Sequence, residues 1–227
     1  MNGACEFSSK QEFLDNVMED EKSCFGSNGE RKLQQHYGTK KRADSFYKRQ
    51  MIDFLNPQMQ EFIREQELLF IATSDSKGEC DSSFRAGLPG FVRILNNKSL
   101  AYPEYRGNGV LASLGNISEN PHIGLMFLDF FKATIGLHIN GKARIVENSD
   151  FLESNATPQE ILDDIATDNG KKPERWVIVE VEEAYIHCSK HIPLLSRQDK
   201  TISWGTDDMK LKGGNFFHVQ KKKDSGE

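Results

Sequence analysis

The pattern of hydrophobic and polar residues changes once along this chain, near Leu68. Before that point, residues 10–66 are rich in Gln, Glu, Lys and Arg with apolar residues at spaced positions, a pattern that predicts helices interrupted near Gly38. Asn56 followed by Pro57 is typical of an N-cap with proline at the first helical position, so a further helix is expected to begin there. The spaced apolar residues are Phe46, Tyr47, Met51, Phe54 and Leu55.

From Leu68 onward the chain consists of short runs rich in apolar, β-branched and aromatic residues, separated by turn sequences such as SDSKG and NNKS. The short connections favour antiparallel pairing, because parallel strands would need crossover helices between them. A sheet of this kind is expected to close or fold over into a small barrel. The seven predicted strands span residues 68–75, 79–87, 90–95, 99–105, 122–130, 133–147 and 175–188.

Two helical segments are expected to interrupt the strands. The first is VLASLGNISEN at residues 110–120. The second covers residues 157–168, where Thr157 is expected to cap the helix and Pro158 to occupy its first turn. The pattern as a whole therefore predicts a mainly β protein with helical additions.

The composition limits the domain number, the cellular location and the partners that are expected for this chain. The chain has 227 residues, of which 37% are hydrophobic and 28% charged, and this fits one domain with polar appendages at both ends. Its net charge of −5 argues against nucleic-acid binding, which needs a basic surface. The first residues do not read as a signal peptide and the apolar runs are too short to span a bilayer, so a cytoplasmic protein without a membrane partner is expected.

The cysteine and histidine residues do not predict a metal site. The four cysteines are scattered without a C-x-x-C pair and are expected to be reduced thiols. The sequence HCSKH at residues 187–191 offers two imidazoles and a thiolate, but structural zinc normally takes four protein ligands. Strand alternation also places His187 and Cys188 on opposite faces. A plain strand end and a cofactor-facing role remain as the interpretations of this cluster.

The stretch YPEYRGNGVLASLGN, which begins at Tyr102, places a flexible, cationic turn between a strand and a helix. Arg106, Asn108 and Ser113 supply hydrogen-bonding groups, while glycines in the turn leave backbone amides accessible. Because a helix start also carries unpaired N–H groups, the turn indicates an anion site. The alternative is a glycine-rich connector with a solvated arginine, since the turn matches neither of the common phosphate-loop motifs.

The order of segments around this turn resembles that of the flavin-nucleotide-binding split-barrel proteins related to pyridoxamine 5'-phosphate oxidase. The resemblance rests on DSSFRAGLPGFVRIL, on the loop and helix that end in Asn-Pro, on LHINGKARIVE and on EEAYIHCSK. It implies a six-stranded antiparallel Greek-key split barrel that forms a homodimer, with one FMN in each of two grooves between the subunits. The implied division is an N-terminal helical arm at 1–55, an FMN-binding split-barrel domain at 56–192 and a C-terminal extension at 193–227.

The resemblance also implies roles for individual residues. Phe91 and Val92 would lie along the isoalloxazine ring of FMN, and His187 and Lys190 would face the cofactor. Basic and polar side chains of two strands and the turn would hold the FMN phosphate, with Arg93 as the alternative to Arg85. The implied phosphate ligands are Arg85, Arg93, Arg106, Asn108 and Ser113.

Two departures from the oxidases bear on function. The head of the helix has Ala112 and Ser113 where the oxidases have an Arg-Lys pair. The arginine and histidine motif with which they bind pyridoxal phosphate is not found in residues 191–217. The chain is therefore not expected to be a true vitamin B6 oxidase.

The resemblance leaves two functions open. One is an FMN-dependent oxidoreductase that moves a hydride between the flavin and a nicotinamide donor or small organic substrate. The other is a non-catalytic protein that binds or carries a flavin, haem or deazaflavin, and fold alone does not separate the two. No residue is identified as catalytic. A homodimer is also expected from the apolar residues on both faces of IGLMFLDFF and WVIVEV, and the helical arm is expected to pack on a barrel.

Overall fold

The computed structural model describes residues 25–167, 172–202, 208, 210–211 and 216–217. The chain divides into two units, residues 1–52 and 53–227. The helical pattern predicted for residues 10–24 lies outside the described residues. Within the described ranges, no helix has the length and apolar composition needed to cross a membrane.

The described part of the first unit is a pair of short helices followed by a two-residue strand. The first helix begins with a capping box, in which Ser27 and Glu30 each accept a hydrogen bond from the backbone N–H of the other. Gly38 has a left-handed backbone, with φ of 66°, and interrupts the helices where the sequence predicted. The hydroxyl of Tyr47 links the two helices by donating to Glu30 at 2.7 Å. The elements are α2 (Asn28–His36), α3 (Lys40–Gln50) and β1 (Met51–Ile52).

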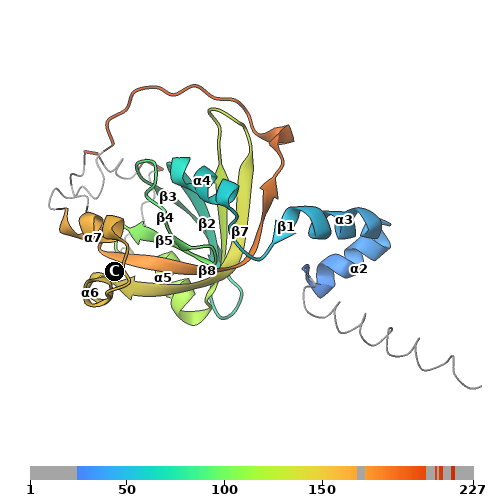
Figure 1. The fold of residues 1–227 in the computed structure, drawn as a ribbon, viewed down its shortest axis with the longest axis horizontal. Helices are drawn as coiled ribbons and strands as arrows, with labels where there is room; N and C mark the ends of the chain where they lie inside the picture. The colour runs from blue at the N-terminus through green and yellow to red at the C-terminus, as the bar shows by residue number, and fades with distance from the viewer. Residues whose placement is uncertain (1–24, 168–171, 203–207, 209, 212–215, 218–227) are drawn as a thin grey trace, which may run out of the picture. The chain divides into compact units, whose positions relative to one another are not determined.

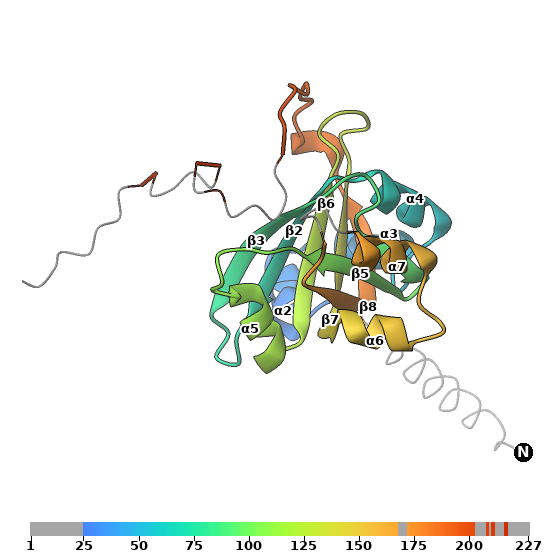
Figure 2. The ribbon, with the colours of Figure 1, turned by 90° about the vertical axis from the view of Figure 1, so that its left-hand side faces the viewer.

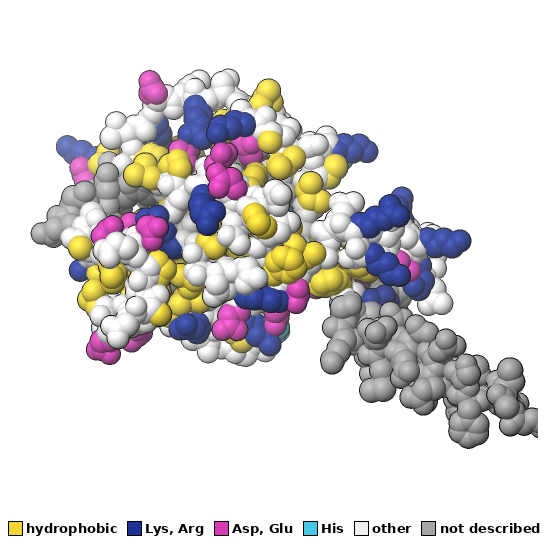
Figure 3. All heavy atoms as spheres, viewed as in Figure 1, with side chains coloured by type: hydrophobic (Ala, Val, Ile, Leu, Met, Phe, Trp, Pro, Cys, Tyr) yellow, Lys and Arg dark blue, Asp and Glu magenta, His cyan; other side chains and the backbone are white. Residues whose placement is uncertain are grey.

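The surface of this helix pair is basic. Figure 3 shows Lys and Arg side chains spread over it. Only Glu30 and Asp44 are acidic within α2 and α3. The net charge of −5 for the whole chain therefore does not extend to these helices. Their basic residues are Arg31, Lys32, Lys40, Lys41, Arg42, Lys48 and Arg49.

Helix α4 begins the second unit where the sequence predicted a helix start. It spans Pro57–Glu65, and the side chain of Asn56 accepts a hydrogen bond from the N–H of Met59 at 2.9 Å. Proline is favoured at the first position because an N–H there would have no acceptor within the helix. Ile63 is fully buried, so the apolar side of α4 faces the core.

Seven strands of the second unit form one antiparallel sheet (Figures 1 and 2). All seven predicted strands are confirmed, and their order in space is β3-β2-β6-β7-β8-β5-β4. Every neighbouring pair is antiparallel, as the short connections favour. The strands are β2 (Leu68–Ser74), β3 (Cys80–Ala86), β4 (Arg93–Asn96), β5 (Ser99–Glu104), β6 (His122–Leu128), β7 (Gly136–Glu147) and β8 (Arg175–His187).

The observed antiparallel sheet differs in strand number from the six-stranded Greek-key split barrel that the resemblance implied. This unit contributes seven strands, because the turn between Asn96 and Ser99 adds β4 as a short edge strand that pairs only with β5. No hydrogen-bonded pairing joins the two end strands, β3 and β4, within the described residues. The fold is thus mixed, an antiparallel sheet with helices, rather than a closed barrel.

Helices α6 (Asn148–Glu153) and α7 (Gln159–Ala166) cover one face of β5, β7 and β8. Phe151 of α6 and Ile161 of α7 pack in one cluster with Trp176 of β8. The rings of Phe151 and Trp176 meet edge to face, with centroids 5.9 Å apart. The apolar residues of WVIVEV, from which a dimer was expected, are therefore buried within the chain itself.

The start of α7 differs from the prediction. Thr157 was expected to cap the helix, but Pro158 occupies the N-cap position. The hydroxyl of Thr157 instead donates to the carbonyl of Phe151 at 2.7 Å and closes the turn between α6 and α7. Helix α6 was not predicted, because its six residues are too few to show a helical period.

Strands β7 and β8 form a long hairpin with one bulge. The pairing skips Glu182 of β8 between Asn140 and Gly141 of β7, so the alternating burial of β8 changes phase there. The two backbones approach closely at Gly141, where an added Cβ would overlap the carbonyl oxygen of Glu180. The bulge therefore requires glycine at position 141.

Candidate functional site

Strand β5 runs into a glycine-rich turn that leads directly into helix α5. The strand ends at Glu104 and the helix spans Ala112–Glu119, which confirms the predicted order of strand, turn and helix. Within the turn, the side-chain oxygen of Asn108 accepts a hydrogen bond from the N–H of Val110 at 3.0 Å, and Gly109 has a φ of 81°. The first N–H groups of α5 have no acceptor within the helix and lie next to the turn.

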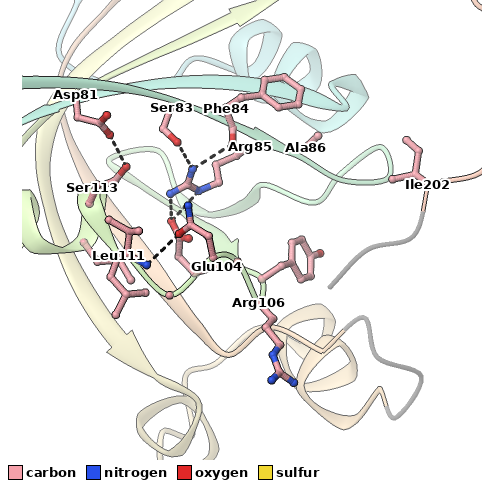
Figure 4. Close-up of a pocket in the computed structure, with 17 residues that line it drawn as sticks. Asp81, Ser83, Phe84, Arg85, Ala86, Glu104, Arg106, Leu111, Ser113 and Ile202 are labelled. Atoms are coloured by element: carbon pink, nitrogen blue, oxygen red, sulfur yellow. Dashed lines mark hydrogen bonds and ion pairs between the residues drawn. The ribbon is translucent and has the colours of Figure 1, made fainter. Parts of the chain in front are cut away.

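The turn and the start of α5 line a groove of about 550 Å³ beside strand β3 (Figure 4). The remaining lining comes from residues 81 and 83–86 of β3, the end of β5 and Ile202. A groove of this volume lies in the range typical of small-molecule sites. Four of the predicted site residues line it together, namely Arg85, Arg106, Asn108 and Ser113.

Arg85 is held by four contacts. Its Nε donates to Oε1 of Glu104 at 2.8 Å, and its Nη2 lies 2.8 Å from the same oxygen. Its Nη1 donates to the hydroxyl of Ser83 at 2.7 Å and to the carbonyl of Phe84 at 3.1 Å. The side chains of Arg85 and Glu104 are only 17% and 11% exposed, so they form a buried ion pair. Since a guanidinium has five N–H donors, Arg85 retains donor capacity toward the groove while Glu104 compensates its charge.

This ion pair also joins distant parts of the sheet. Arg85 lies on β3, which is one end strand, whereas Glu104 lies on β5, next to the other end strand. The sheet must curve for these two side chains to meet, although its end strands are not hydrogen bonded in the part of the chain that the structure describes. The groove therefore lies where the two ends of the curved sheet approach each other.

The groups beneath the groove are poorly solvated. Burial raises the pKa of Glu104, while the neighbouring Arg85 acts in the opposite direction. Tyr102, two residues earlier on β5, is fully buried, and its hydroxyl has no hydrogen-bond partner among the described residues. Burial, with the nearby charge of Glu104, raises the pKa of this phenol as well. Charges in this region are thus weakly screened by water.

Carboxylates balance the arginines of the groove. The hydroxyl of Ser113 donates to Oδ2 of Asp81 at 3.1 Å, and both residues line the groove. With Asp81 and Glu104 opposite Arg85 and Arg106, the formal charges of the lining side chains sum to zero. This differs from the cationic site that the turn sequence indicated, because Glu104 directly before the turn and Asp81 of the distant strand β3 also line the groove.

Arg106 does not converge with Arg85. Figure 4 shows the guanidinium of Arg106 extended away from the pair that Arg85 forms with Glu104. A ligand group bound at Arg85 would therefore meet Arg106 only after a change of its side-chain rotamer.

Phe91, Val92 and Arg93 do not line this groove. Phe91 and Val92 are 5% and 1% exposed and belong to the core. Arg93 donates from Nε and Nη2 to Asp164 of α7, at 2.9 and 2.6 Å, and so joins β4 to that helix. The contacts with FMN that the resemblance implied for these three residues stay predictions.

His187 and Lys190 lie at the end of β8, also outside the groove lining. Nδ1 of His187 is 2.8 Å from Nε2 of His138, and His138 stacks on Tyr185 with centroids 4.8 Å apart. Burial, with the neighbouring imidazole of His187, lowers the pKa of His138. Lys190 is exposed in the short 3₁₀ helix Ser189–His191. The described part of the chain holds no group of three His, Cys, Asp or Glu side chains placed to bind a metal.

The sequence analysis missed three residues of the groove, Asp81, Ser83 and Glu104. Asp81, Ser83 and Arg85 occupy alternate positions of β3, so the strand period of two was the signal that could have grouped them. Glu104 gave no such signal, because its partner Arg85 comes from a strand that is not its neighbour in the sheet.

The fold and the groove define a protein with a curved antiparallel sheet and a ligand-sized groove where the ends of the sheet meet. A family model described as pyridoxamine 5'-phosphate oxidase matches residues 55–188. The chain belongs to this family, as the resemblance implied. No curated protein matches the chain.

The chain is also similar to several solved structures, at low sequence identity. A point variant of HupZ from Group A Streptococcus is 22% identical over 59% of this chain and 99% of its own, with a TM-score of 0.44. HutZ, the heme storage protein from Vibrio cholerae, is 17% identical over 59% of this chain and 93% of its own, with a TM-score of 0.37. An FMN-binding protein from Syntrophomonas wolfei is 10% identical over 56% and 84%, with a TM-score of 0.39. Likenesses of this size do not assign an activity to this chain.

Proposed function

We propose that this protein binds FMN and acts as an FMN-dependent oxidoreductase. One observation carries the proposal: in a chain of the pyridoxamine 5'-phosphate oxidase family, a single groove gathers Arg85, Ser83 and the start of α5. Guanidinium, hydroxyl and helix-start N–H groups are common partners of phosphate, so the donor set fits a phosphate monoester. The two carboxylates of the groove, those of Asp81 and Glu104, oppose this fit in part.

Each part of the groove has a role in the proposed complex. Arg85 and Ser83 hold the phosphate, and the Asn108 turn presents the backbone N–H groups of α5 to it. Phe84 and Val110, which are 50% and 70% exposed, provide apolar surface for the ring system. Bound FMN would supply hydride transfer, with a nicotinamide nucleotide or a small organic molecule as the other reactant. The protein itself orients the cofactor and limits the access of water.

Flavin titration tests this proposal. The purified protein is expected to bind FMN. The absorption of the bound flavin is expected to bleach when a reduced nicotinamide nucleotide is added. Arg106→Ala is expected to weaken FMN binding about tenfold, because it removes a charge-assisted contact that Arg106 forms after turning toward the phosphate. Affinities are measured by fluorescence titration with FMN and, in parallel, with riboflavin, which has no phosphate.

The matched control is Arg64→Ala, since Arg64 is an exposed arginine of α4 that does not line the groove. Both variants should bind riboflavin as the unchanged protein does. Equal losses of FMN and riboflavin in Arg106→Ala would contradict a phosphate contact at the turn. A bound pigment that no donor reduces would support the alternative, a non-catalytic carrier of flavin, haem or deazaflavin.

We also propose that the protein is a homodimer in which the second copy completes the cofactor groove. Phe84, Val110 and Leu111 line the groove and are each at least half exposed, so a partner subunit would bury them. Light scattering is expected to give twice the chain mass of 25.8 kDa. A monomer that retains bound FMN would exclude this arrangement.

A further inference from the structure

The carboxylate of Glu104 already pairs with Arg85, the cation that the proposed phosphate would contact. Both Nε and Nη2 of Arg85 contact Oε1 of Glu104 at 2.8 Å. The two side chains are mostly buried, so water screens the carboxylate poorly from anything that binds at Arg85. An anion at this arginine would therefore lie close to a negative charge that the fold itself supplies.

We propose that Glu104 is an internal competitor of the anionic ligand: its carboxylate pairs with Arg85 and so sets how tightly a phosphate group binds in the groove. This role rests on the proposed function. An anion binds well in the groove only when Glu104 is neutral or has released Arg85. Glu104 is thus a specificity-determining residue of the groove rather than a structural ion pair alone.

The geometry favours competition over simple stabilisation. Arg85 already has Ser83 and the carbonyl of Phe84 as partners on Nη1, so its orientation does not depend on Glu104 alone. Glu104 is also fixed at its backbone, where its carbonyl accepts from the N–H of Glu174 at 2.9 Å. The carboxylate can therefore lose its charge while both backbones stay in place.

Protonation of Glu104 gives the groove a pH dependence. Burial already raises the pKa of this carboxyl, so it takes up a proton at a higher pH than an exposed glutamate does. As the pH falls, Glu104 becomes neutral and anion binding is expected to strengthen. The charged or titratable groups that face Glu104 or share its groove are Arg85 and Asp81 of β3, Tyr102 of β5, Arg175 of β8, and Tyr105 and Arg106 of the turn.

Glu104→Gln tests the proposal, because glutamine keeps the shape and one acceptor for Arg85 but has no charge. At about pH 8 the variant is expected to bind FMN at least about tenfold more tightly than the unchanged protein, with riboflavin affinity unaltered. The advantage should shrink toward about pH 5, where Glu104 itself is increasingly protonated. The same comparison made with sulfate, which keeps both of its charges over this range, separates this effect from the protonation of the FMN phosphate. If Glu104 had a purely structural role, the FMN affinities of the two proteins would not become more alike as the pH falls.

The matched control is Glu67→Gln. Glu67 pairs with Arg197 at 2.6 Å, which is also a carboxylate and arginine pair, but neither residue lines this groove. This variant should leave FMN affinity unchanged at every pH. Equal or weaker FMN binding by Glu104→Gln, relative to riboflavin, would overturn the proposal.

Two further measurements separate this inference from the flavin proposal. If FMN binds to neither protein but inorganic phosphate binds more tightly to Glu104→Gln, the flavin proposal fails and the competitor role stands. If phosphate binding is the same in both proteins, the competitor role fails. Should the variant not fold, sulfate binding to the unchanged protein decides, because sulfate keeps both charges as the pH falls: stronger binding supports the role, and constant binding overturns it.

Discussion

Replacing Arg85 with alanine is expected to lower the free energy of unfolding by about 3 kcal/mol at about pH 7.5. The substitution leaves Glu104 buried without its cationic partner, and an uncompensated buried charge costs far more than an intact pair contributes. It also removes the side-chain link between β3 and β5, at opposite ends of the sheet. This loss lies at the lower end of the range that is usual when one partner of a buried ion pair is removed, because the Arg85 side chain is still 17% exposed. Chemical denaturation followed by circular dichroism measures the change.

The loss in Arg85→Ala should depend on pH in a defined direction. The pKa of Glu104 is raised by burial above its ordinary value of 4.5, so the folded state binds this proton more readily than the unfolded state does. Stability from this group is therefore present at acidic pH and lost as the pH rises through the folded pKa. Without Arg85 that pKa rises further, and the deficit of the variant grows from acidic to neutral pH. Adding Glu104→Gln should restore part of the stability, and a deficit that is constant with pH would contradict the account.

Gly141→Ala is expected to lower the free energy of unfolding by a similar amount, about 3 kcal/mol. An added methyl group would overlap the carbonyl oxygen of Glu180 on the neighbouring strand. Because the obstacle is backbone, it cannot move aside as a flexible side chain would, and the hairpin of β7 and β8 must shift. Denaturant titration of the variant measures the loss.

Gly115→Ala is the matched control for this substitution. Gly115 lies within α5, and an added Cβ there would meet no atom within 4 Å. Alanine should therefore stabilise the protein by about 0.5–1 kcal/mol, because glycine is the poorer helix former. Equal stability of the two alanine variants would show that the backbone at the bulge adjusts without strain.

The fold could be predicted from the sequence where local pattern decides it. All seven strands and the helix start at Asn56 and Pro57 were predicted, because strand runs and proline positions act within a few residues. Closure of the sheet could not be judged in this way. It depends on whether β3 and β4 exchange backbone hydrogen bonds, and no residue pattern within either strand reports on that.

The candidate site could be predicted only in part, for a similar reason. Arg106, Asn108 and Ser113 were grouped from the turn sequence itself, whereas Arg85 was added only because a family resemblance supplied a long-range contact that local patterns lack. The opposing carboxylates were not predicted, since Asp81 and Glu104 look like ordinary polar residues at strand ends. The contact of Glu104 with Arg85 and that of Asp81 with Ser113 join segments distant in the sheet or the sequence, which no local pattern encodes.

The position of β8 in the sheet has a consequence for biosynthesis. It is the last strand among the residues that the structure describes, yet it lies between β7 and β5 and connects the two halves of the sheet. During translation, β5 leaves the ribosome long before β8 and has only the short edge strand β4 to pair with. Residues 100–104 of β5 are all buried in the finished fold, so the nascent chain exposes an apolar strand that invites aggregation. The sheet of this unit can therefore be completed only after β8 has been synthesised, and chains that end before β8 are expected to aggregate.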